Sequence, residues 1–268
     1  MQFLLLAQAL GAAPAPMGSV GDASALHRTD VVIPWSQLAF EPARPESPAM
    51  GPDLLAVGSG GVTAVFDAAD DRVSVTGGAA FAVGRADGLA FDTAGHIVVL
   101  DDGAREVRVY SAGGSRLDRM ALPGVAPAGG TLLVQGESIV SVDLFGNGHP
   151  LAIVARTGML SPVDGVELLA PTHRVTRNGG TISVDGRAVV TRTGRVGARS
   201  LGGWLLVEAM NEGTVTREAF RLANGASVTL PVRGRRYAPT LDVVSAPDDT
   251  LAWMDPRDDG LHVVTVTP

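Results

Sequence analysis

The sequence predicts an all-β protein built from repeated units of short strands. The chain holds 34 glycines and 17 prolines in 268 residues, a composition typical of a fold with many turns. Short apolar runs rich in β-branched residues alternate with turn residues along most of its length. Beyond residue 20, no stretch keeps apolar residues at helical spacing for three turns, so we expect no substantial helix.

Residues 87–114 show the repeated unit most clearly, with the sequence DGLAFDTAGHIVVLDDGAREVRVYSAGG. We predict three strands at 89–91, 97–100 and 107–110, because each is apolar and each gap carries the Asp and Gly residues that reverse a backbone. Such a unit leaves its edges unpaired and its faces uncovered. It therefore needs copies of itself beside it.

The spacing of these copies indicates a β-propeller. Comparable central strands are expected to begin near residues 57, 97, 138, 204 and 250. The long interval from 138 to 204 must hold one further unit, at about 166–194, whose strand pattern is weaker than that of the others. A period of about 40 residues with four short strands per repeat is typical of propellers. We therefore predict about six four-stranded blades between residues 52 and 268, with five or seven blades as alternatives.

The last unit is one strand short of a full blade, because only 241–244, 250–254 and 261–267 have strand patterns. The isolated run at 31–35 is expected to supply the missing outer strand, since pairing the two ends of the chain removes an open edge. We divide the chain into a possible signal peptide at 1–15, a flexible segment at 16–30 and one propeller at 31–268, with a closing strand at 31–40 and a Pro-rich connector at 41–52.

The N-terminal residues suggest export. An apolar run at 3–13 precedes Ala13-Pro14-Ala15, which has the form of a signal-peptidase site. We expect a periplasmic or secreted protein, although no basic residue precedes the run and Pro16 would follow the cut. The alternative is a frayed N-terminus or a misassigned start. The run is too short to span a bilayer, so no transmembrane segment is predicted.

Charge and cysteine content exclude several functions. The formal net charge of −7 disfavours nucleic acid as a partner, because a phosphate backbone requires a cationic surface. The cluster of Arg233, Arg235 and Arg236 is too short to reverse this. The absence of cysteine excludes disulfides, thiolate nucleophiles and cysteine-based metal sites.

Residues 87–114 resemble the repeats of the NHL family and of the related gluconolactonase/senescence-marker lactonases. The shared pattern is a turn with Gly before a strand that ends in Asp, followed by an apolar strand and a hairpin into a strand such as Arg108-Val109-Tyr110. The resemblance implies a propeller, and propellers serve both as enzymes and as binding platforms.

The lactonase resemblance implies one candidate site residue, Asp87. In that family the Asp of an Asp-Gly pair binds a divalent cation on the central axis, and here Asp87-Gly88 matches it. Calcium, magnesium or manganese would suit such a site and would polarise a lactone carbonyl. The family also requires a Glu in the first blade and an Asn one blade before the Asp. Here the hairpin at 54–67 contains no Glu and no Asn precedes Asp87, so we interpret Asp87 as a turn residue.

Other residue patterns point to no catalytic centre. Four acidic pairs lack the alternating ligands of a calcium loop, the histidines are scattered, and no Gly-x-Ser-x-Gly elbow occurs. The three tryptophans are expected to pack between blades. The acidic pairs are Asp70-Asp71, Asp101-Asp102, Asp248-Asp249 and Asp258-Asp259, the histidines are His27, His96, His149, His173 and His262, and the tryptophans are Trp35, Trp204 and Trp253.

We therefore predict a non-catalytic propeller that binds another protein or a cell-envelope component through loops at its rim or channel mouth. This interpretation assigns no catalytic residue, no cofactor and no particular binding residue. The alternative is a metal-dependent, lactonase-like hydrolase that holds calcium, magnesium or manganese in the central channel through Asp87.

Overall fold

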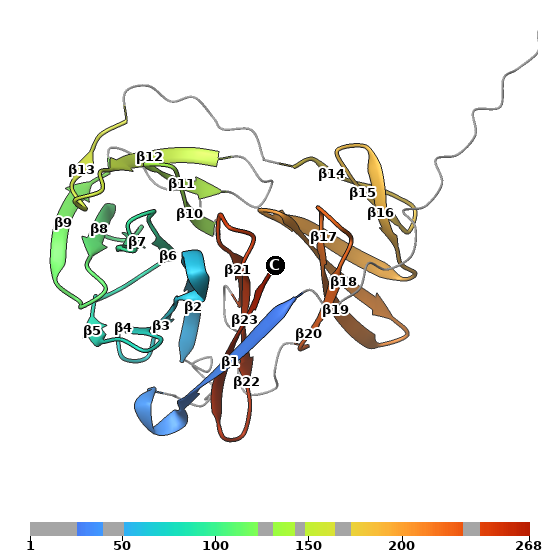
Figure 1. The fold of residues 1–268 in the computed structure, drawn as a ribbon, viewed down its shortest axis with the longest axis horizontal. Helices are drawn as coiled ribbons and strands as arrows, with labels where there is room; N and C mark the ends of the chain where they lie inside the picture. The colour runs from blue at the N-terminus through green and yellow to red at the C-terminus, as the bar shows by residue number, and fades with distance from the viewer. Residues whose placement is uncertain (1–25, 40–50, 123–130, 143–147, 164–172, 233–241) are drawn as a thin grey trace, which may run out of the picture.

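The chain folds as an all-β propeller. The structure is a computed structural model that describes residues 26–39, 51–122, 131–142, 148–163, 173–232 and 242–268. These residues form six antiparallel sheets that are arranged around a common centre (Figure 1). This arrangement confirms the predicted all-β propeller class. Apart from two short 3-10 helices, η2 (Trp35–Gln37) and η3 (Ser59–Gly61), every element described is a strand.

The first three blades each contain four strands in sequence order, and β2, β6 and β10 lie nearest the middle in Figure 1. The first blade comprises β2 (Pro52–Val57), β3 (Thr63–Asp67), β4 (Arg72–Val75) and β5 (Ala80–Ala82). The second comprises β6 (Gly88–Phe91), β7 (Ile97–Asp101), β8 (Glu106–Tyr110) and β9 (Arg116–Ala121). The third comprises β10 (Thr131–Gln135), β11 (Ser138–Val142), β12 (Gly148–Val154) and β13 (Leu160–Ser161).

The remaining blades are less uniform, because one has three strands and another takes a strand from the far end of the chain. The fourth blade comprises β14 (Val175–Asn178), β15 (Thr181–Val184) and β16 (Arg187–Thr191). The fifth comprises β17 (Arg195–Leu201), β18 (Trp204–Asn211), β19 (Thr214–Arg221) and β20 (Ser227–Leu230). The last comprises β21 (Val243–Ser245), β22 (Leu251–Pro256), β23 (Gly260–Thr267) and β1 (His27–Pro34).

The second blade shows how the local sequence forms a hairpin. Strand β7 is buried on both faces, and its residues Ile97, Val98 and Val99 have no exposed area, which explains its continuous apolar run. The preceding turn is held by Asp92, whose Oδ1 accepts hydrogen bonds from the backbone N–H groups of Ala94 and His96. Apolar strands and Asx turns together specify the unit that the sequence predicts.

The core consists of apolar clusters between neighbouring blades. The clusters join the last blade to the first and second, the second to the third, the fourth to the fifth, and the fifth to the last. Trp204 and Trp253 are buried in the cluster between the fifth and last blades, and the Trp204 Nε1–H donates to the carbonyl of Asp249 at 2.7 Å. This agrees with the prediction that tryptophans pack between blades.

The N-terminal strand lies at the outer edge of the last sheet, next to β23. Strand β1 pairs antiparallel with β23 over eight residues, from His27 opposite Thr267 to Pro34 opposite Gly260. It begins at His27, whereas the sequence places 27–30 in a flexible segment. The difference arises because pairing with β23 orders the backbone even where the side chains are exposed.

The fourth blade differs from the predicted four strands. Three residues, 192–194, connect β16 directly to β17, so this stretch has no room for a hairpin and another strand. Each of the first, second, third and fifth blades continues from its third strand into a local fourth one. The outer position of the fourth blade is therefore not filled by any described strand.

Several sequence predictions fall on residues outside the described ranges. They concern the possible signal peptide at 1–15, most of the flexible segment and of the connector at 41–52, and the Arg233, Arg235 and Arg236 cluster. Within the described ranges, no helix combines the length and the apolar character needed to cross a membrane.

Candidate functional site

Asp87 lies at the start of β6, where its carboxylate holds a turn. Both carboxylate oxygens accept hydrogen bonds from Arg85, from Nη2 at 2.8 Å and from Nε at 3.0 Å. Oδ2 also accepts the backbone N–H of Asp102 at 2.9 Å, which ties β6 to the end of β7. This arrangement fits the turn role that we prefer for Asp87.

These bonds also set the protonation of Asp87. Burial by itself would raise the pKa of this carboxyl. The hydrogen bonds from Arg85, Asp102 and Gly103 outweigh burial and hold the pKa of Asp87 below its usual value. Among the residues the structure describes, no three His, Asp or Glu side chains gather in a group that could hold a metal ion. The assignment of Asp87 as a metal ligand stays a prediction.

A thermal melt tests that assignment. We expect Asp87→Ala to destabilise the protein by about 1 kcal/mol, because hydrogen bonds that hold the β6–β7 turn are lost. The loss should be equal in EDTA and in calcium, magnesium or manganese, since a turn residue has no cation to release. The control is Asp53→Ala, which removes a carboxylate from β2 and should leave any effect of the cations on the melting temperature unchanged. A rise in melting temperature with one cation that disappears only in Asp87→Ala would instead support the lactonase-type metal site.

The other acidic and histidine candidates also serve local structure. The carboxylate of Asp101 pairs with Arg108 at 3.0 Å, and Asp92 contacts His96 at 2.8 Å. His262 lies between two carboxylates, with Nδ1 2.9 Å from Asp30 and Nε2 3.0 Å from Asp259. The contact with Asp30 joins β1 to β23, and the contact with Asp259 joins the β22–β23 turn to β23. Both contacts therefore stabilise the last blade.

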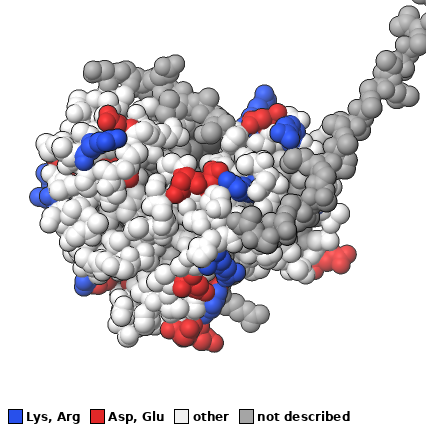
Figure 2. Space-filling view, viewed as in Figure 1, with Lys and Arg blue, Asp and Glu red and all other residues white. Residues whose placement is uncertain are grey.

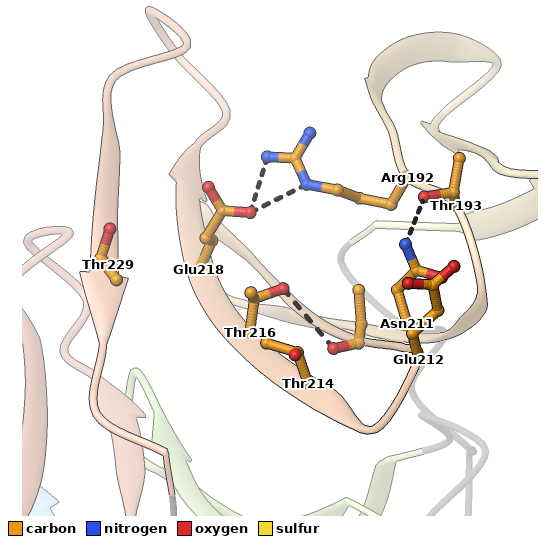
Figure 3. A pocket seen from close by; sticks show the side chains of 9 residues that line it. Arg192, Thr193, Asn211, Glu212, Thr214, Thr216, Glu218 and Thr229 are labelled. Carbon is orange, nitrogen blue, oxygen red and sulfur yellow. Dashed lines mark hydrogen bonds and ion pairs between the residues drawn. The ribbon is translucent and has the colours of Figure 1, made fainter.

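A groove lies beside the incomplete fourth blade, against the outer strands of the fifth. Its volume is about 600 Å³, which falls within the roughly 300–1,000 Å³ range of ligand pockets. Figure 3 shows its side chains on the loop after β16, on the β18–β19 hairpin and on β20. The lining residues are Arg192, Thr193, Ala209, Asn211, Glu212, Thr214, Thr216, Glu218 and Thr229.

The period-two pattern of β19 forms the floor of this groove. Thr214, Thr216 and Glu218 project to one face of the strand, where the two threonines are exposed (Figure 3). The alternate residues Arg217 and Ala219 are 2% and 0% exposed. The covered face of β19 is thus confined to Arg217 and Ala219, because Val215 on the same face is 38% exposed, while the face that lines the groove is polar and open.

Charged side chains frame the groove. The Arg192 guanidinium contacts Oε2 of Glu218 through Nε at 2.9 Å and Nη2 at 2.6 Å, and it lies 5.5 Å from the centre of the Phe220 ring. Glu212 projects from the β18–β19 turn near Asn211, whose Nδ2 donates to Thr193 (Figure 3). The lining carries one Arg and two Glu, so its formal charge is −1.

The charged surface shows no extended basic area on the face seen in Figure 2. Acidic and basic side chains there form small mixed groups over a mostly uncharged surface.

Sequence reasoning did not find this groove. Two signals were present: the unit at 166–194 is shorter than the others, and Thr214, Thr216 and Glu218 place polar residues at alternate positions of one strand. Neither signal indicates by itself that this polar face lies opposite a blade with three described strands. That juxtaposition depends on how the blades pack.

Comparison with known proteins gives no family for the chain. No family model matches it, and no curated protein matches it. Among solved structures, U3-55K aligns over 89% of this chain and 94% of its own, with 13% identity and a TM-score of 0.37. The Cps50 (Swd1) β-propeller domain of Myceliophteria thermophila aligns over 86% of this chain and 99% of its own, with 10% identity and a TM-score of 0.41.

Proposed function

We propose that this propeller is a non-catalytic binding platform and that the groove between its fourth and fifth blades is the docking site. One observation carries the proposal: a polar groove lies where no described strand fills the outer position of the fourth blade. A partner can occupy such a face without displacing any of the strands that the structure describes.

The chemistry of the groove supports reversible docking. Between the second and third blades, the outer strands meet through apolar side chains, among them Leu117 and Leu160. In the groove, the outer strands of the fifth blade present Thr214, Thr216 and Thr229 instead. Hydroxyl groups tolerate water when the groove is empty and can still bond to a partner, as in interfaces that form and dissociate.

The proposal includes two features that follow from the sequence alone. We propose that the platform acts outside the cytoplasm, in the periplasm or after secretion, because residues 3–15 have the pattern of an apolar run and a cleavage site. We also propose a relationship to the NHL and gluconolactonase propellers, supported by the repeat at 87–114. N-terminal sequencing of the exported protein tests the first feature.

Site-specific cross-linking tests the docking site. Because the chain has no cysteine, Thr216→Cys provides a single attachment point for a benzophenone label in the groove. We expect this label to cross-link a discrete protein in extract from the source organism. The matched control is Ser115→Cys, an exposed position in the β8–β9 turn, which should give no such product.

Competition completes this experiment. Excess unlabelled protein should suppress the Thr216 cross-link, whereas unlabelled Thr216→Arg should not, because the longer, charged side chain projects into the groove from its floor. Equal cross-linking from both labelled positions, or full competition by Thr216→Arg, would contradict the proposed site.

A further inference from the structure

We propose that the occupant of the groove is an extended segment of a partner protein, which adds to β16 as the fourth strand of the fourth blade. This inference rests on the proposed function and specifies how the platform binds. It makes main-chain pairing with β16 the principal contact, with side chains in the groove supplying selectivity.

The first argument is the free edge of β16. Among the described residues, β16 pairs only with β15, so its other edge has no strand partner. The short 192–194 connection prevents the chain from placing a local strand there. An unpaired edge presents N–H and C=O groups at strand spacing, which is a template for another extended chain.

The second argument is that this molecule already completes one blade with a remote strand. The last blade also lacks a local outer strand, and β1 fills that position from the other end of the chain. Of the eight residues of β1, only Ile33 is buried, so the strand is held largely by main-chain pairing with β23. An outer strand supplied from elsewhere is therefore compatible with this architecture.

The third argument is the position of the groove. A strand added beside β16 would lie opposite β19, because the cluster joining these two blades includes Val189 and Val190 of β16 and Phe220 of β19. Its alternate side chains would point towards Thr214, Thr216 and Thr229, and the intervening ones would point away. The groove thus has room for one row of side chains from a fourth strand.

Charge indicates which side chains the segment carries. Arg192 pairs with Glu218, whereas Glu212 has no ion pair within the part of the chain that the structure describes. A basic residue near the β18–β19 turn would balance the formal charge of −1, and small hydroxyl residues would suit the threonines. We therefore expect an extended segment with one Arg or Lys and with Ser, Thr or other small residues facing the groove.

Backbone methylation of peptides tests strand addition directly. Nine-residue peptides are selected from a phage-displayed random library on the full-length protein, with counter-selection on Thr216→Arg. Each peptide is then synthesised in two forms, N-methylated at odd or at even positions, and binding is measured by fluorescence anisotropy. We expect one form to bind roughly 10-fold or more weakly and the other to keep its affinity, because only one edge of an added strand meets β16.

The side-chain contribution is measured with Glu212→Gln, which preserves shape and removes the charge. We expect selected peptides with a basic residue to bind about 2- to 5-fold more weakly to this variant, the range of an exposed ion pair. Hydrogen exchange supplies the location: amides of β16 should gain protection when the peptide is bound, with amides of β8 as the reference.

The outcomes separate this inference from the proposed function. If both methylated forms bind as well as the parent peptide, the groove is a docking site but strand addition is wrong. If no selected peptide is sensitive to Thr216→Arg while the native partner still cross-links at Thr216, the partner does not dock as an extended segment. If peptide binding and cross-linking both fail, the docking site itself is wrong.

Discussion

Replacing Arg217 by methionine is expected to lower the free energy of unfolding by about 3–5 kcal/mol, because it breaks a buried ion pair. Arg217 reaches from β19 in the fifth blade towards Asp242, just before β21 in the last blade. Its Nη1 lies 2.7 Å from Oδ2 of Asp242, and its Nη2 lies 3.1 Å from Oδ1. The two side chains are only 2% and 4% exposed.

The network around this pair explains the size of the effect. Arg217 also donates to Oε1 of Glu208 at 2.8 Å and to the carbonyl of Pro231 at 3.0 Å. Burial by itself would lower the pKa of Arg217, but Asp242 and Glu208 raise the pKa, so the guanidinium stays charged. Removing the guanidinium leaves the Asp242 carboxylate buried without this partner. The free-energy cost of burying that charge is then no longer offset by Arg217, and this destabilises the fold.

A double variant separates the charge effect from lost packing. We expect Arg217→Met with Asp242→Leu to recover most of the stability lost in Arg217→Met, because the buried carboxylate is removed together with its guanidinium partner. Thermal and urea unfolding should show a drop of roughly 6–20 °C for the single variant, at about 2–4 °C per kcal/mol in a chain of this size. A single variant as stable as the parent would contradict the proposed link between the two blades.

Removing β1 is the second change with a large expected effect. A chain lacking residues 1–34 should lose about 3 kcal/mol or more, whereas a chain lacking only 1–25 keeps the strand and provides the matched control. Ile33 alone is buried in the cluster shared by the last and first blades, and emptying such a site costs about 2–5 kcal/mol. The contact between Asp30 and His262 is lost as well.

Loss of β1 also exposes the edge of β23, which is buried along nearly its whole length. We therefore expect the shorter chain to self-associate at micromolar concentration, since an exposed apolar edge strand is a template for pairing. A synthetic peptide of residues 26–35 should restore part of the melting temperature. Equal melting temperatures for the two truncations would show that β1 adds nothing to the stability of the propeller.

Much of the local structure was predictable from the sequence. The strands at 97–100 and 107–110 agree closely with β7 and β8, because strongly apolar, β-branched runs are separated by turns rich in Asp and Gly. Strand β18 also begins at Trp204, where the repeat spacing predicts a central strand. Local hydrogen bonds, such as those of Asp92 to Ala94 and His96, form between residues a few positions apart.

The sequence by itself determined the all-β repeat, the turns and the exclusion of cysteine chemistry, since these depend on composition and on neighbours along the chain. Only the tertiary structure decided three other features: the start of β1 at His27, the buried pair of Arg217 and Asp242, and the groove beside β16. Arg217 and Asp242 are 25 positions apart, and Asp30 meets His262 across 232. Such contacts depend on strand register and on packing between blades, and no local pattern encodes either one.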